Sequence, residues 1–125
     1  MTTARQELGK RGELIAERWL EERGWRVVER RFRSGHRDID LVMEQLGAEG
    51  RLVAFVEVKT RASDGYGGPL GAIHWRKRRE MTRAAREWLA KKRREGDSFR
   101  FDIVGVLYRG GVVEVVHVED AFRVR

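Results

Sequence analysis

Three residues, Asp40, Glu57 and Lys59, have the types and spacing that metal-assisted phosphodiester hydrolysis uses. That reaction employs a hard cation, which polarises the phosphoryl oxygen and activates a water molecule. Mg²⁺ takes oxygen ligands in near-octahedral geometry and keeps several of its waters. The carboxylates of Asp40 and Glu57, together with the main-chain carbonyl of Val58, would supply a partial ligand set for Mg²⁺ or Mn²⁺.

Lys59 completes the pattern because an ammonium beside the attacking water can orient it and offset charge on the phosphorus. As a text pattern, an aspartate followed by Glu-x-Lys is common by chance. The alternative interpretation is a buried Glu57–Lys59 ion pair with Asp40 near by. Buried ion pairs are weak stabilisers, so that arrangement would itself need a reason.

The segment that carries Glu57 and Lys59 is predicted to be an interior strand. β-Branched and apolar residues dominate Leu52 to Val58, which is typical of strands. Side chains alternate across a strand, so Val53, Phe55, Glu57 and Lys59 share one face, and Leu52, Ala54, Val56 and Val58 share the other. One face therefore begins apolar and ends with two charges, as expected where a core strand opens into a polar site.

Asp40 lies on the preceding strand, predicted over Arg37–Leu46, on which Ile39, Leu41 and Met43 face one way and Asp38 and Asp40 the other. The short loop 47–50 predicts a hairpin with the strand over Arg51–Thr60. Counting outward from this loop places Asp40 roughly opposite Glu57. The hairpin thus brings the two carboxylates together.

Two helices are predicted to flank these strands. The first spans Thr3–Arg23, with Thr3 and Gln6 at capping-box spacing. Glu13 lies at the edge of its apolar stripe, where it is either a solvated boundary charge or a carboxylate directed toward the site.

The second helix spans Ala72–Arg94 and carries ten Lys or Arg against two Glu. Most of these charges are expected on a solvated face. Lys77, however, falls on the apolar stripe between Ile73 and Met81, so it either extends outward or reaches a polar pocket. The glycine-rich segment Ser63–Gly71 before this helix is predicted to be a loop, either a lid over the site or a plain connector.

Further strands are predicted over Trp25–Arg33, Phe99–Tyr108 and Val112–Val118. The order helix, three strands, helix, two strands indicates one α/β or α+β domain over residues 1–125. Asp102, on the fourth strand, could point into the site or pair with a basic neighbour. The three histidines, His36, His74 and His117, have no metal-ligand spacing and are interpreted as surface or rim residues.

The composition favours a polyanionic partner, because the chain carries a net charge of +7, with 27 Lys or Arg against 20 Asp or Glu. It contains no cysteine, which excludes disulfides and thiolate metal sites. The charged N-terminal segment does not read as a signal peptide, and no segment approaches the ~20 apolar residues of a membrane span. We therefore expect a cytoplasmic protein that acts away from membranes.

Taken together, several motifs resemble those of the YraN family, small bacterial proteins assigned to the restriction-endonuclease-like superfamily and similar in core to archaeal Holliday junction resolvases. The resemblance runs from about Gly9 to Val104. Its motifs are Gly12-Glu13 with Ala16 and Leu20, Ile39-Asp40-Leu41, the run from Phe55 to Arg61, Tyr66-Gly67 with Pro69, Lys77, and the run from Arg100 to Val104.

This resemblance implies a central mixed β-sheet flanked by helices, with Asp40 and Glu57 as metal ligands and Lys59 as the catalytic lysine. By similarity to the resolvases, Glu13 would reach the metal site from the first helix. One departure concerns the family's usual Gly-Glu-Ile-Asp-Leu, which here reads Arg37-Asp38-Ile39-Asp40-Leu41. Asp38 is one methylene shorter than the usual Glu, so the role of that Glu is not carried over.

Two functions remain open from the sequence, a Mg²⁺- or Mn²⁺-dependent nuclease acting on DNA, including branched or recombining DNA, and a non-catalytic nucleic-acid-binding module. A third reading is a scaffold protein whose basic face meets an acidic protein. A homodimer is expected only by analogy with the resolvases. The residues predicted to contact nucleic acid are Arg61, Arg76, Lys77 and Arg78.

Overall fold

The computed structural model describes residues 3–35, 37–61 and 73–124. They form two helices and five strands in the expected order. The elements are α1 (Ala4–Glu21), β1 (Arg26–Ser34), β2 (Arg37–Gly47), β3 (Gly50–Arg61), α2 (Trp75–Lys92), β4 (Ser98–Arg109) and β5 (Val112–Phe122).

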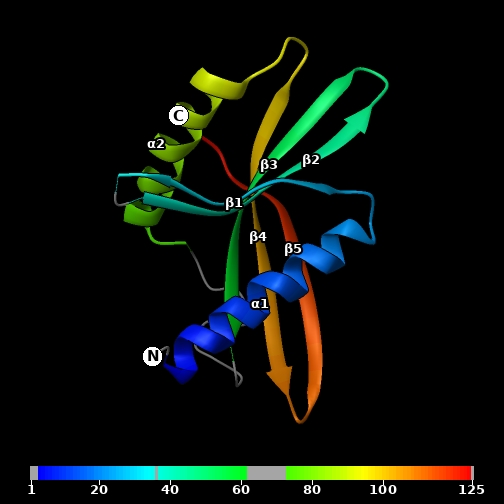
Figure 1. Ribbon diagram of the computed structural model, residues 1–125, viewed down its shortest axis with the longest axis vertical. Helices are drawn as coiled ribbons and strands as arrows, with labels where there is room; N and C mark the ends of the chain where they lie inside the picture. The colour runs from blue at the N-terminus through cyan, green and yellow to red at the C-terminus, as the bar shows by residue number, and fades with distance from the viewer. Residues whose placement is uncertain (1–2, 36, 62–72, 125) are drawn as a thin grey trace.

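The five strands form one mixed sheet in the order β1-β2-β3-β4-β5. Neighbouring strands are antiparallel except β3 and β4, which run parallel. Parallel neighbours need a long crossover, and α2 lies within the connection between these two strands. The helices lie on opposite sides of the sheet (Figure 1). The expected α/β architecture is confirmed.

The central strand β3 is buried on both faces, as its alternation predicts. Val53 and Phe55 pack with Trp88 of α2 in one apolar cluster. Ala54 and Val56 pack with Leu20 of α1 in the other. Each helix packs its apolar stripe into one cluster. This packing fixes α1 on one face of β3 and α2 on the other.

The predicted face of β2 is wrong at one residue. Leu41 and Met43 pack on the α1 side, whereas Ile39 packs with Phe55 and Trp88 on the α2 side. Strict alternation would keep all three on one face, so β2 departs from it between Ile39 and Leu41. Asp40 lies at this irregularity and is therefore placed between the two faces.

The predicted boundaries differ most at the second helix and the last strand. The second helix begins at Trp75, because the His74 side chain caps it by accepting a hydrogen bond from the Arg76 N–H. It ends at Lys92, since Arg93 is extended. Strand β5 continues to Phe122, four residues beyond the prediction. The predicted loop Ser63–Gly71 and Ala72 lie outside the described residues.

Within the described part of the chain, neither helix is long and apolar enough to cross a membrane.

Candidate metal and catalytic site

The candidate site lies where β2 and β3 separate. Their pairing runs from Gly47↔Gly50 to Leu41↔Val56, and Asp40 and Glu57 are the next residues on each strand. Beyond this point β2 turns toward α2 while β3 continues beside β4 (Figure 1). The Val58 N–H donates a hydrogen bond to Asp40 Oδ2 at 2.8 Å. The side chain of Asp40 thus connects the two strands at the fork, the point where β2 and β3 separate, and this hydrogen bond fixes its position.

The carboxyl group of Asp40 has a strongly raised pKa. Its pKa is raised from the ordinary 3.8 to about 7, chiefly by burial and next by the neighbouring charge of Glu57. The Val58 hydrogen bond and the charge of Lys77 lower the pKa of Asp40 in opposition. The two carboxylates are therefore close enough to repel each other, as the hairpin register predicts.

Glu57 is also largely buried, with 16% of its side chain exposed. Burial raises its pKa, and the positive charges of Lys77 and Lys59 oppose that rise. Lys77 Nζ lies 3.3 Å from Glu57 Oε2, yet this buried oxygen accepts no hydrogen bond of normal geometry from the described residues. Lys77 thus reaches the polar pocket that was one of its two predicted positions.

Lys59 lies two residues beyond Glu57 on β3 and is partly buried. Desolvation and the charge of Arg61 lower its pKa, whereas the charge of Glu57 raises it. An ammonium with a lowered pKa close to acidic groups is typical of functional sites. Its role in orienting a water molecule stays a prediction.

Glu13, on α1, lines the same hollow as Asp40 but does not complete a group of three ligands with Asp40 and Glu57 among the described residues. Its charge raises the pKa of both Asp40 and Glu57. Gly12 makes this approach feasible, because a Cβ there would lie 1.9 Å from Thr60 Oγ1 on β3. The small residue lets the helix lie directly against the strand.

Arg31 is a neighbour of the site that the sequence did not reveal. Its Nη2 donates to Glu13 Oε2 at 3.1 Å. Its backbone φ is +48°, a left-handed conformation that is uncommon for residues other than glycine. Periodicity cannot show such a local irregularity, so no sequence signal identified this pair.

The donor set of the site fits a hard divalent cation in type and is small in number. Asp40 and Glu57 supply carboxylate oxygens, and Glu57 Oε2 is buried without a hydrogen bond. Among the described residues, however, no group of three or more His, Cys, Asp or Glu side chains is close enough together to hold a metal ion. Mg²⁺ retains several waters when it binds proteins, so two carboxylates with waters satisfy its needs. The Val58 carbonyl stays a predicted ligand.

The other predicted residues are more dispersed. Asp38 pairs with Arg33 of β1 at 3.7 Å. Arg61 and Arg76 are exposed, and Arg78 donates to the Ile73 carbonyl. Lys77 is therefore the predicted nucleic-acid contact that the fold brings to the acidic pair.

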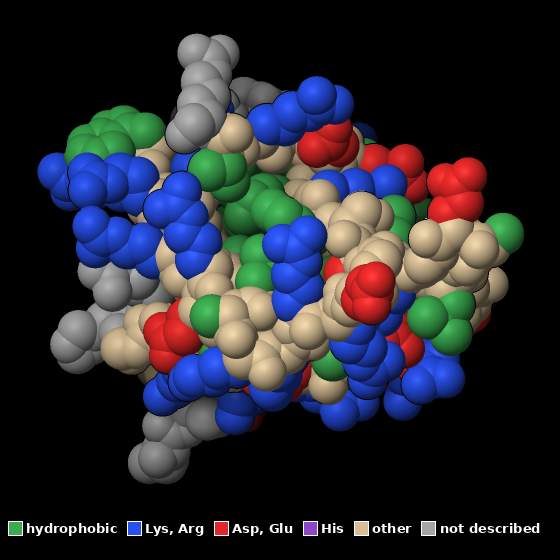
Figure 2. All heavy atoms as spheres, turned by 90° about the horizontal axis from the view of Figure 1, so that it is seen from above, with side chains coloured by type: hydrophobic (Ala, Val, Ile, Leu, Met, Phe, Trp, Pro, Cys, Tyr) green, Lys and Arg blue, Asp and Glu red, His purple; other side chains and the backbone are tan. Residues whose placement is uncertain are grey.

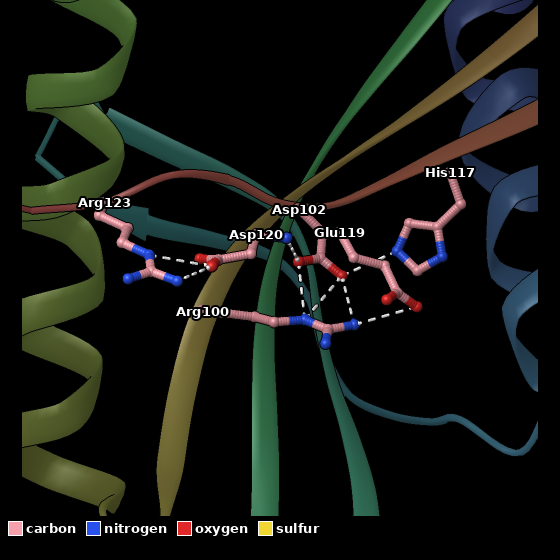
Figure 3. A network of polar contacts seen from close by, with 6 residues as sticks. All are labelled: Arg100, Asp102, His117, Glu119, Asp120 and Arg123. Atoms are coloured by element: carbon pink, nitrogen blue, oxygen red, sulfur yellow. Dashed lines mark hydrogen bonds and ion pairs between the residues drawn. The ribbon is translucent and has the colours of Figure 1, made fainter.

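Asp102 belongs to a separate buried network (Figure 3). It is fully buried and accepts hydrogen bonds from Arg100 and from the Asp120 N–H, both at 2.9 Å, with His117 Nε2 2.7 Å away. Of its two predicted positions, pairing with basic neighbours is confirmed. The interpretation of His117 as a surface or rim residue is wrong, because its side chain is only 8% exposed.

Comparison with known proteins identifies the family. A model described as "Uncharacterised protein family UPF0102" matches residues 12–106. The chain belongs to the UPF0102 family. A UPF0102 protein of Geobacter metallireducens is 36% identical over 98% of this chain and 97% of its own length. Another, from Rhodococcus opacus, is 40% identical over 92% and 95%.

The predicted resemblance to this family, which also carries the name YraN, is thereby confirmed. Its assignment to the restriction-endonuclease-like superfamily stays a prediction. Among solved structures, Pyrococcus furiosus SfsA in complex with Ca²⁺ aligns with a TM-score of 0.36 and 12% identity, over 92% of this chain and 63% of that chain. A likeness this low supports no conclusion about the UPF0102 site.

Proposed function

We propose that this UPF0102 protein is a divalent-metal-dependent nuclease that hydrolyses phosphodiester bonds in DNA. The observation that carries the proposal is the pair of largely buried carboxylates, Asp40 and Glu57, which lie where β2 and β3 separate and whose pKa values are raised. Two acidic groups are costly to bury together unless a cation compensates them. Lys77 provides one positive charge, and a divalent cation would supply the rest.

Each residue has a role in this proposal. Asp40 and Glu57 would hold Mg²⁺ or Mn²⁺, and the Val58 N–H keeps Asp40 oriented. When bound, such an ion polarises the phosphoryl oxygen and makes water a better nucleophile. Lys59 would orient the attacking water and offset the charge that develops on the phosphate. Glu13 would add negative charge from α1, and Lys77 positions Glu57.

The test is a cleavage assay on duplex, branched and single-stranded DNA with Mg²⁺ or Mn²⁺. We expect cutting that Asp40→Asn and Glu57→Gln each reduce by at least about a hundredfold, because the isosteric changes remove charge without removing bulk. Asp38→Asn is the matched control, since Asp38 lies on the same strand and pairs with Arg33 instead. If both metals leave every substrate uncut, the proposal is refuted.

A second candidate is a nucleic-acid-binding module without catalysis. It is favoured by the exposed arginines of α2, several of which form no ion pair within the described part of the chain. Calorimetry with Mn²⁺ separates the two functions. Binding that is lost in Asp40→Asn supports the nuclease, whereas DNA binding without any metal binding supports the module.

A further inference from the structure

A groove lined by arginines runs between α2 and the end of β5, on a part of the molecule distinct from the acidic pair. Its volume is about 1020 Å³. Its lining residues include five arginines and no acidic residue, namely Arg78, Arg79, Thr82, Arg83, Arg86, Ala121, Phe122, Arg123 and Val124. The C-terminal end of β5 returns beside α2 in Figure 1, and Lys and Arg side chains gather on the α2 side of the molecule in Figure 2.

Packing of α2 explains why these charges point outward. Its inner stripe of Met81, Ala84, Ala85 and Trp88 is buried against the sheet. Arg79, Arg83 and Arg86 therefore occupy the opposite face of the helix.

The charges of this face are not neutralised. Within the described part of the chain, Arg79, Arg83 and Arg86 form no ion pair, whereas Arg123 pairs with Asp120. Arg79 and Arg83 are four residues apart and Arg83 and Arg86 three apart, spacings at which like charges repel each other. This repulsion does not stabilise the fold. An anionic ligand would neutralise these charges and relieve it.

The row has dimensions that suit a phosphate backbone. Arg86 lies seven positions after Arg79, which is about 10 Å along a helix axis. The phosphates of one strand rise by ~3.4 Å each along the axis of duplex DNA and lie farther apart along an extended unpaired strand, so the row spans about two to three of them. Guanidinium groups bind phosphate oxygens in pairs of parallel hydrogen bonds.

An aromatic side chain stands at the start of the same row. Trp75 is 54% exposed and lines a smaller hollow together with Arg76 and Glu80, and this hollow shares Arg79 and Arg83 with the groove. The guanidinium carbons of Arg76 and Arg79 lie 5.5 and 5.6 Å from its ring centroid. An exposed ring beside a basic groove is how proteins stack the unpaired bases of single strands.

We propose that this arginine groove, with Trp75 at its end, binds a single nucleic-acid strand. Arg79, Arg83 and Arg86 contact successive phosphates, and Trp75 stacks on an unpaired base. This inference rests on the proposed function in one respect, that the partner is a nucleic acid. It adds that the preferred substrate contains an unpaired segment. Lys77 links the two places, because it lies on the same helix and contacts Glu57.

The test is fluorescence anisotropy of a labelled 20-mer of dT, measured in EDTA so that cutting cannot occur. Arg83→Ala/Arg86→Ala is compared with Arg11→Ala/Arg18→Ala, which removes the same charge from exposed positions of α1. We expect the groove variant to weaken binding at least tenfold and the control less than twofold. Each lost phosphate contact lowers the slope of log K against log[salt] by about 0.7, so the groove variant should lower it by about 1.4.

A second pair of variants tests stacking. Trp75→Ala should weaken binding of the 20-mer at least fivefold and leave a duplex of equal length within twofold, while Trp75→Phe keeps most of the affinity. Circular dichroism checks that each variant is folded. Equal losses in the groove and control variants, an unchanged affinity in Trp75→Ala, or displacement of the 20-mer by polyglutamate at equal charge concentration would each overturn the inference.

The two proposals fail separately. Groove-dependent binding in EDTA without any cutting in Mn²⁺ leaves the groove standing and refutes the nuclease. Cutting in Mn²⁺ combined with binding that is indifferent to the groove variant refutes the groove alone.

Discussion

The metal-free protein should become less stable as the pH rises from 5.5 to 8.0, and Asp40 should be the main cause. Burial raises the pKa of this carboxyl to about 7 in the folded chain, against an ordinary 3.8. Between these values the folded state holds a proton that the unfolded state has released. Stability therefore falls with rising pH, which is opposite in sign to an ion-paired carboxylate with a lowered pKa.

The magnitude follows from the same values. The rise in the pKa of Asp40 from 3.8 to about 7 corresponds to about 4 kcal/mol of stability over the full titration, at 1.36 kcal/mol for each pKa unit. Between pH 5.5 and 8.0 a group with a pKa of about 7 accounts for about 2 kcal/mol of that loss. Glu57 adds to the loss with the same sign, because its pKa is raised as well.

Urea unfolding in EDTA at the two pH values measures the effect. Asp40→Asn should remove most of the pH dependence, because an amide keeps the shape and can still accept the Val58 hydrogen bond. Asp38→Asn should keep it. Mn²⁺ should stabilise the unmodified protein more at pH 8.0 than at pH 5.5, since it binds the ionised carboxylates. A stability that rises with pH, or an unaltered slope in Asp40→Asn, would refute the reasoning.

Three further outcomes are expected from urea unfolding. Lys77→Met should destabilise the protein by about 1–2 kcal/mol at pH 8.0 and by less at pH 5.5, because it leaves the ionised Glu57 without its partner. An equal loss at both pH values would contradict this reason. Gly12→Ala should cost about 1–3 kcal/mol through its clash with β3, whereas Gly9→Ala, with open space around it, should gain up to about 1 kcal/mol. Asp102→Ala should cost about 3–5 kcal/mol yet leave Mn²⁺ affinity unchanged in calorimetry, because its network is structural; weaker Mn²⁺ binding would assign it to the site.

The sequence predicts this fold well where side-chain periodicity dominates. Alternation along β3 places Phe55 and Val56 on opposite faces, and the short loop 47–50 sets the register that runs to Leu41↔Val56, so that Asp40 and Glu57 are the next residues on the two strands. Both depend on local geometry that adjacent residues determine. The capping box of Thr3 and Gln6 is local in the same way and is formed as predicted.

Features that depend on departures from regular geometry could not be predicted in this way. Ile39 changes face because β2 is irregular beside Asp40, and Arg31 reaches Glu13 from a left-handed backbone conformation. Contacts across a strand pair depend on register, which periodicity within one strand does not give. His117 lies against Asp102 because the β4–β5 pairing places it opposite Val104 and shifts register between Phe101 and Ile103.

The fork between β2 and β3 accounts for both the location and the chemistry of the site. If the ladder continued, β2 main-chain groups would bond β3 beyond Val56; instead, the Val58 N–H donates to the side chain of Asp40. The same separation leaves room for Lys77 to reach Glu57 from α2 and for Glu13 to approach from α1. Burial that raises the pKa of two neighbouring carboxylates disfavours their charged forms, so the fold opposes the state that the pair would need to bind a metal. A divalent cation removes that opposition, and metal affinity should accordingly rise steeply with pH as both groups ionise.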